Sequence, residues 1–327
     1  MQPITLRLLP GTLALMLAAS PALAQSPGAN YPSRTITIIA PFAPGGPVDV
    51  ESRIYSKKLT EMTGQKVVVD YKPGANSSIG GAYVARATPD GYTLLVGTAG
   101  LPLIPTQYKD LSYDILKDLA PLSQMSERTS VLLMRPGFPA KNFKEYAAYS
   151  RANPEKVSYG YSSGSSQLVG AWLHNLAKLK VIFIGYKGVG AATADLMSDR
   201  LDLLSSTLAV SLPMMKSGKA RGLVNLGMRR SKLVPDLQTV PEQGLPEFDF
   251  AGNWFGFLAP GATPPDVTNK LVELFVTMAH APDVIAQLEA QGSTAIGSKP
   301  PEFRKLIATE VVRWAKVARD SGIELGD

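Results

Sequence analysis

Hydrophobic residues change their spacing repeatedly along the first hundred positions, and each change marks a predicted strand or helix. Residues 34–40 form a β-branched apolar run that is typical of a strand. After a turn rich in glycine and proline, apolar residues recur at helical spacing up to Gly64: Val50, Ile54, Tyr55, Leu59 and Met62. Strands over 66–71 and 92–96, with a short helix over 79–87 between them, continue the alternation. This order of elements predicts a mostly parallel α/β sheet flanked by helices.

The middle of the chain repeats the same order. An apolar run over 119–135 is predicted to cross into a second lobe. The expected strands there cover 156–159, 181–184, 201–204 and 222–226, and the expected helices cover 142–151, 167–179, 191–198 and 213–216. A strand over 253–258 should return the chain to the first lobe. Three helices, the first capped by Thr263, should then pack on that lobe. The pattern predicts two similar α/β lobes joined by two crossing strands.

Composition narrows the functional classes. The chain has 327 residues, 45% of them hydrophobic and 18% charged, which suits an ordered protein large enough for two cores. Its net charge of +6 comes from scattered Lys and Arg, so we expect no nucleic-acid partner. The absence of cysteine excludes disulfides and thiolate chemistry, and two histidines are too few for a His-rich metal site. We therefore expect no metal and no cofactor.

The N-terminus has the layout of a secretory signal peptide. Arg7 precedes an apolar run over 8–19, and Ala22-Leu23-Ala24 is a small-residue cleavage site. The run is too short for a membrane anchor, so we expect cleavage after Ala24 and no membrane insertion afterwards. Export combined with the absence of cysteine suits a bacterial periplasm.

The turn over residues 42–49 (Phe-Ala-Pro-Gly-Gly-Pro-Val-Asp) is the first candidate site. It joins a predicted strand to the start of a predicted helix. The first N–H groups of a helix have no internal partner, and the helix dipole favours an anion there. We hypothesise that this turn holds one end of a small carboxylate. An ordinary strand–helix connection is the alternative, and Asp49 would then serve the helix dipole.

A serine-rich loop over 162–166 is the second candidate. Gly160-x-Ser162-x-Gly164 matches the nucleophile elbow of α/β-hydrolases, so an exported serine esterase is one interpretation. Its acid would be Asp202 or Asp236, but the two histidines of the chain, at 174 and 280, are misplaced for a triad. Several hydroxyls at a helix start alternatively form a second anion cradle or a simple N-cap. The chain has no complete dinucleotide-binding fingerprint and no Walker loop.

From about residue 31 onwards the chain resembles the substrate-binding proteins of tripartite tricarboxylate transporters, the Bug family. The matching pieces are Tyr31-Pro32-Ser33-Arg34, residues 41–46 with Asp49, Lys72-Pro73-Gly74-Ala75, and residues 87–95, 186–188, 217–221 and 258–265. Together these motifs cover essentially the whole of the expected mature chain.

The resemblance implies a type II periplasmic binding protein fold, in which two α/β lobes close on a ligand around two hinge strands. Each lobe is expected to be a mixed, mostly parallel sheet flanked by helices. The expected division is a signal peptide over 1–24, lobe 1 over 25–127, lobe 2 over 128–250, and a return to lobe 1 over 251–327. The implied partners are a small carboxylate and the permease subunits of a membrane transporter, with the receptor acting as a monomer. The implied ligand-binding residues are Phe42, Ala43, Pro44, Gly45, Gly46, Asp49, Thr98, Ala99, Ser162, Ser163, Ser165, Ser166, Tyr186, Ser205 and Ser206.

The sequence departs from the family pattern on the lobe 2 side. The serine loop is short and contains Tyr161, Gly185 replaces the usual proline, and Ser205-Ser206 stands where Phe-Asp is common. These departures affect the far end of the ligand. A dicarboxylate is expected, and Tyr161 with Phe42 makes an aromatic one plausible. A sensor that binds ligand for a signalling partner is the remaining alternative.

Overall fold

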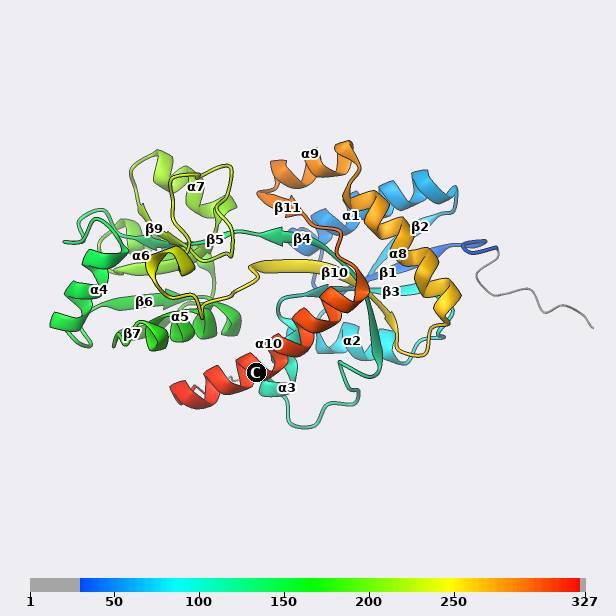
Figure 1. Ribbon diagram of the computed structural model, residues 1–327, viewed down its shortest axis with the longest axis horizontal. Coiled ribbons are helices and arrows are strands. Elements are labelled where there is room, and N and C mark those ends of the chain that lie inside the picture. Colours follow the sequence, from blue (N-terminus) through cyan, green and yellow to red (C-terminus); the bar gives the residue numbers. More distant parts are fainter. Residues whose placement is uncertain (1–29, 324–327) are drawn as a thin grey trace, which may run out of the picture.

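The computed structural model describes residues 30–323 and shows two lobes, each built around one β-sheet (Figure 1). The expected signal peptide, residues 1–24, lies outside the described residues. The lobe 1 sheet has the strand order β11-β4-β10-β3-β1-β2, and the lobe 2 sheet has the order β7-β6-β8-β5-β9. The strands of lobe 1 are β1 (Ile36–Ala40), β2 (Val67–Tyr71), β3 (Thr93–Thr98), β4 (Leu119–Arg128), β10 (Asn253–Pro260) and β11 (Ser293–Ala295). Those of lobe 2 are β5 (Ser130–Met134), β6 (Ser158–Tyr161), β7 (Ile182–Gly185), β8 (Leu203–Thr207) and β9 (Arg221–Asn225).

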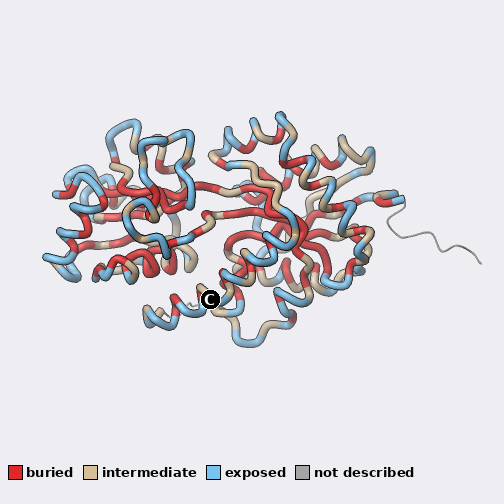
Figure 2. Tube along the Cα trace, viewed as in Figure 1, coloured by how far each residue is buried: buried red, intermediate tan, exposed pale blue. Residues whose placement is uncertain are grey.

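Helices flank both sheets. Lobe 1 carries α1 (Pro47–Thr63), η1 (Ala75–Ser77), α2 (Ser78–Ala85), η2 (Leu101–Leu103), α3 (Ile104–Gln107), α8 (Pro265–Ala279) and α9 (Pro282–Ala290). Lobe 2 carries α4 (Phe143–Ala152), α5 (Gly164–Leu176), α6 (Val189–Met197), α7 (Leu208–Lys216) and η3 (Pro241–Gln243). The last helix is α10 (Pro300–Ser321). The strands are mostly buried, while the outer faces of the helices are exposed (Figure 2).

The predicted two-lobed α/β fold with mixed sheets flanked by helices is confirmed, and the parallel pairs lie within the βαβ units. In lobe 1, β1 pairs in parallel with β2 and β3, as its helical crossovers require. In lobe 2, β6 pairs in parallel with β7 and β8. The strands that carry the chain between lobes, with the β9 and β11 edges, add antiparallel pairs in both sheets. The sequence pattern of each βαβ unit cannot reveal these later insertions.

The two connecting strands are β4, which continues into β5, and β10, which returns the chain. They lie side by side between the lobes (Figure 1) and pair antiparallel, with Asn253 opposite Arg128. Their register shifts at Phe255/Gly256 and again at Phe257/Leu258. Such irregularities bend a strand pair. The predicted pair of crossing strands is therefore present.

Three helices begin elsewhere than predicted. α5 begins at Gly164 and α7 at Leu208, each several residues earlier than expected; the first turn of α5 includes the polar residues Ser165 and Ser166, whereas that of α7 is mostly apolar. Thr263 is not the N-cap of α8, since its hydroxyl donates to the carbonyl oxygen of Pro260 at 2.7 Å; the cap is Pro264.

The last helix, α10, was expected to pack on lobe 1 alone. α8 and α9 pack on lobe 1 as predicted, but α10 packs on both lobes. Near its start, Phe303 lies in the lobe 1 core beside Trp254, with ring centroids 5.1 Å apart. Near its end, Trp314 lies in the lobe 2 core beside Trp172, with centroids 5.8 Å apart. α10 thus contacts both lobes, and its first half packs against the connecting strand β10 (Figure 1).

Within residues 30–323, no single helix is long and apolar enough to cross a membrane. The bent pair α8 and α9 passes the test of length and composition together, with a 66° bend between the two helices.

Candidate ligand-binding cleft

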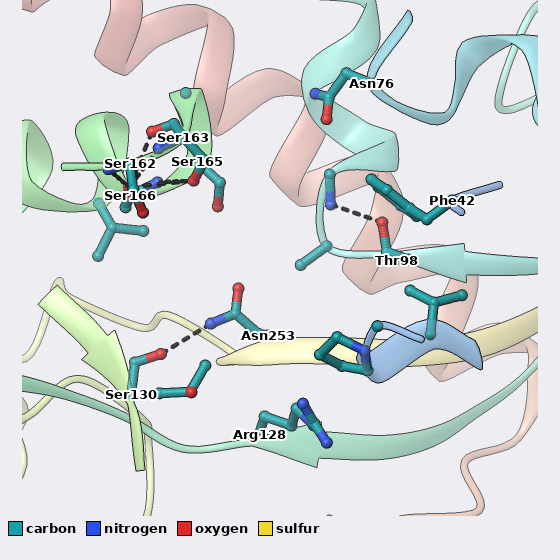
Figure 3. A pocket seen from close by; sticks show the side chains of 18 of the residues that line it. Phe42, Asn76, Thr98, Arg128, Ser130, Ser162, Ser163, Ser165, Ser166 and Asn253 are labelled. Carbon is teal, nitrogen blue, oxygen red and sulfur yellow. Dashed lines mark hydrogen bonds between the residues drawn. The ribbon is translucent and has the colours of Figure 1, made fainter. Parts of the chain in front are cut away.

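A cavity of about 1250 Å³ lies between the two lobes. Its walls come from the turn before α1, the end of β3, the loop before α5, strand β8 and the connecting strands. Figure 3 shows this cavity with Phe42, Asn76 and Thr98 facing the serine loop of lobe 2. The predicted residues that line it are Phe42, Ala43, Gly46, Thr98, Ala99, Ser162, Ser163, Ser165, Ser166, Ser205 and Ser206. Residues far apart in the sequence are therefore brought to one cleft.

Four predicted site residues do not line the cavity: Pro44, Gly45, Asp49 and Tyr186. Gly45 adopts a φ of +91°, which turns the chain toward the helix. Asp49 is buried, and its carboxylate accepts hydrogen bonds from the N–H of Gly45 at 2.9 Å and from Tyr71 and Arg53. Burial opposes its ionisation, but these hydrogen bonds outweigh burial and hold its pKa below the ordinary value. Asp49 thus fixes the turn from behind.

Tyr186 is likewise engaged inside lobe 2. Its hydroxyl donates to Asp195 Oδ2 at 3.0 Å, and its ring lies over Gly160. Partial burial and the Asp195 hydrogen bond raise its pKa. Tyr161 does not line the cavity either, because its ring packs against Phe183 at 6.5 Å. The aromatic part of the wall instead consists of Phe42 and four residues that were not predicted as site residues: Tyr108, Phe250, Trp254 and Phe255.

The start of α1 lies at the cleft and has no side-chain cap. Its N-cap, Gly46, has no side chain that could bond the first N–H groups, and Pro47 occupies the first helical position. Gly46, Pro47 and Val48 all line the cavity. A helix start without a side-chain cap favours an anion or another acceptor.

The four serines of the loop over residues 162–166 divide into two pairs. Ser163 is the N-cap of α5: its Oγ accepts from the N–H of Ser166 at 3.2 Å, and Ser166 Oγ accepts from the N–H of Ser163 at 3.1 Å. This reciprocal arrangement is a capping box. The hydroxyls of Ser162 and Ser165 make no hydrogen bond to another group within residues 30–323. Ser162 and Ser165 therefore have hydroxyls available to a ligand (Figure 3).

Neither histidine reaches the cleft. His174 is buried in the lobe 2 core, with Nε2 bonded to the Tyr146 hydroxyl at 2.7 Å and Nδ1 to the Gly170 carbonyl at 2.6 Å. Burial lowers its pKa to about 4. His280 is bonded to the Val276 carbonyl at the end of α8. Ser162 thus has no histidine beside it, which removes the esterase interpretation of the Gly160-x-Ser162-x-Gly164 motif.

Sequence reasoning missed several polar residues of the cavity wall. Arg128 and Ser130 flank the passage from β4 to β5, and Asn253 begins β10. Asn253 Nδ2 donates to Ser130 Oγ at 2.8 Å, which joins the two connecting strands (Figure 3). The only sequence signal was the polar interruption of the apolar run over 119–135.

The loop before α2 is also part of the wall. Ala75, Asn76 and Ser77 have φ values of +43°, +46° and +78°, a conformation that is strained for residues with side chains. Asn76 Nδ2 donates to Gln107 Oε1 at 2.6 Å, which holds this loop against α3. Within the described residues, no group of three or more His, Asp or Glu side chains could hold a metal ion.

A cleft between two α/β lobes, joined by a strand pair and walled by hydroxyls and helix starts, defines a solute-binding receptor. The family model of the tripartite tricarboxylate transporter family receptor matches residues 52–323, and this chain belongs to that family. Its members are substrate-binding receptors rather than enzymes.

Known relatives and solved structures agree. Protein BugT of Bordetella pertussis is 32% identical over 302 residues, which cover 90% of this chain and 92% of the relative. The structure of the periplasmic binding protein BugD is 30% identical, covers 90% of this chain and 99% of that one, and has a TM-score of 0.70. MatC from Rhodopseudomonas palustris, solved with bound malate, is 29% identical, covers 88% and 99% of the two chains, and has a TM-score of 0.68.

Proposed function

We propose that this receptor captures a small dicarboxylate in the periplasm, as a monomer, and delivers it to the membrane subunits of a tripartite tricarboxylate transporter. The observation that carries the proposal is the opposition, across one cavity, of the uncapped start of α1 and the free hydroxyls of Ser162 and Ser165. The malate bound by MatC supports the ligand class. The apolar and aromatic part of the wall also suits ligands with a larger hydrocarbon body, including aromatic dicarboxylates.

The structure suggests a division of roles between the lobes. Lobe 1 offers backbone N–H groups, which any carboxylate accepts. Lobe 2 offers hydroxyls, including Ser205 and Ser206 on β8, at positions where this chain departs from its family's pattern. We propose that lobe 1 recognises a carboxylate and that lobe 2 selects the particular ligand.

Calorimetric titration tests the ligand class. The expected mature chain, residues 25–327, would be titrated with malate, adipate, terephthalate and benzoate, and with the neutral diamide of adipate. At least one acid should bind and the diamide should not. If the diamide bound as well as the acids, or if no acid bound, the carboxylate proposal would fail.

A further inference from the structure

Arg128 is the one charged side chain in the cavity wall formed by residues 30–323. It ends β4 on the hinge side of the cleft, opposite Asn253 of β10 and Ser293 of β11. The residue is only 6% exposed. A buried guanidinium needs partners for its N–H groups, so the direction of each group is informative.

One side of the guanidinium is held by Glu51, which is fully buried on α1. Arg128 Nε donates to Glu51 Oε1 at 3.3 Å and to Ser293 Oγ at 3.0 Å. Glu51 also accepts from the hydroxyls of Ser293 at 2.7 Å, Tyr55 at 2.8 Å, and Ser126. The carboxylate is thus saturated, and its network fixes the orientation of Arg128.

The other side of the guanidinium is weakly occupied. Nη2 has a long contact of 3.4 Å to the carbonyl oxygen of Gln291, and Nη1 donates to no group among the described residues. The guanidinium lies at the cavity wall in Figure 3, and the ring of Phe255 lies 5.6 Å from its Cζ. Unpaired guanidinium N–H groups at the wall of an otherwise uncharged cavity fit the oxygens of a carboxylate.

Glu51 also places this cation close to the start of α1. It lies only four residues after Pro47, which corresponds to about 6 Å along a helix axis. Both Arg128 and the first residues of α1 line the same cavity.

Resting on the proposed function, we propose that Arg128 binds one carboxylate of the ligand beside the start of α1, and that the cleft requires charge at this end only. The opposite wall holds serines, Thr207, Val189 and Val210, with no cation. A serine hydroxyl can donate to the oxygen of a carboxylate, a carboxamide or a hydroxyl group, and it can also accept from an amide N–H or a hydroxyl, so it does not require a charged group. The ligand class is therefore a carboxylic acid with a hydrocarbon body and a second polar end whose charge is not needed.

Ligand chemistry gives the first test, and it needs no variant. Titrations would compare a diacid, its monoamide and its diamide, for succinate, adipate and terephthalate. In the series that binds most tightly, the monoamide should bind within about tenfold of the diacid. The diamide should then lose a further factor of roughly 10 to 100, as expected for one hydrogen-bonded charge. A monoamide as weak as the diamide would overturn the claim that one charged end suffices.

A pair of variants tests Arg128 itself. Arg128→Met alone would leave Glu51 buried and unpaired, so the informative variant is Glu51→Gln combined with Arg128→Met. Glu51→Gln alone, which keeps the cation, is the matched control. The double variant should unfold at a temperature close to that of the control, yet bind the diacid and the monoamide roughly 10- to 100-fold more weakly.

Each outcome of this comparison decides something. If the folded double variant binds like the control, Arg128 serves only to pair with Glu51 and the inference is wrong. If the double variant does not fold, the monoamide comparison on the unmodified protein still decides the one-end claim. If the unmodified protein binds none of these three acids, and neither malate nor benzoate, the proposed function fails rather than this inference.

Discussion

At the scale of single residues, the serine loop separates binding from stability. Ser163 and Ser166 cap α5 through each other, whereas the hydroxyls of Ser162 and Ser165 have no hydrogen-bond partner among residues 30–323. Serines that lie close together in the sequence are therefore expected to have different roles.

We expect Ser162→Ala and Ser165→Ala each to weaken binding of the best diacid by roughly 2- to 10-fold, since one neutral hydrogen bond is lost. Their unfolding temperatures should stay unchanged. Ser163→Ala, the control for a capping role, should lower the free energy of unfolding by about 1 kcal/mol. Calorimetry and chemical denaturation measure the two effects. A stability loss in Ser162→Ala larger than that in Ser163→Ala would contradict this division.

The cavity wall was only partly predictable from the sequence. Gly46 and Ser162 can be recognised as site residues from their neighbours in the sequence, because turn and capping preferences act over a few residues. Arg128 carries no such mark, since its position at the wall depends on pairing with Asn253 and Ser293, far along the chain. The sequence around Asp49 also gave no sign that its carboxylate accepts a hydrogen bond from Tyr71, because Tyr71 lies on strand β2, outside the local segment.

At the scale of elements, α10 contains a buried carboxyl at the point where it passes between the lobes. Glu310 is fully buried, and its Oε2 accepts from Trp254 Nε1 at 2.9 Å, while its Oε1 has no hydrogen-bond partner in the part of the chain that the structure describes. Burial raises the pKa of Glu310 from 4.5 to about 8. The folded protein therefore keeps this proton to a higher pH than the unfolded chain does.

Raising the pH through this window should weaken folding. The contribution of Glu310 is fully present below about pH 4.5 and is lost as the pH rises to about 8, with a slope of about 1.4 kcal/mol per pH unit. Glu310→Gln, which keeps the acceptor for Trp254, should flatten part of this decline. Denaturation curves at pH 5 to 8.5 measure it. Glu127, whose pKa burial raises to about 7, adds to the decline up to that pH, while His174, whose pKa burial lowers from 6.5 to about 4, opposes it up to about pH 6.5; an unchanged slope in the variant would contradict the assignment.

Element types were easier to predict than their partners. Helical spacing and β-branched runs revealed the βαβ units of both lobes, because each element carries its own buried face. The double attachment of α10 was not visible, since the apolar residues of one helix do not show which core they enter. Trp314 and Phe303 look alike in the sequence but lie in different lobes.

At the scale of the whole molecule, the cavity lies between lobes joined by the strand pair β4 and β10. Receptors of this architecture close by hinge bending. We expect a saturating diacid to reduce the radius of gyration in solution scattering and to change the fluorescence of Trp254, which lines the cavity. The diamide of the same acid is the control. Calorimetric binding without any change in the scattering curve would argue against closure.

Residues on α10 also affect how tightly the receptor holds its solute. The helix is packed into lobe 1 by Phe303 and into lobe 2 by Trp314, so closure must bend it or loosen one attachment. The free energy spent on that rearrangement reduces the observed affinity, although no ligand atom touches these residues. Substitutions on the side away from the cleft can therefore change the solute concentration at which the receptor fills, without changing which solute it accepts.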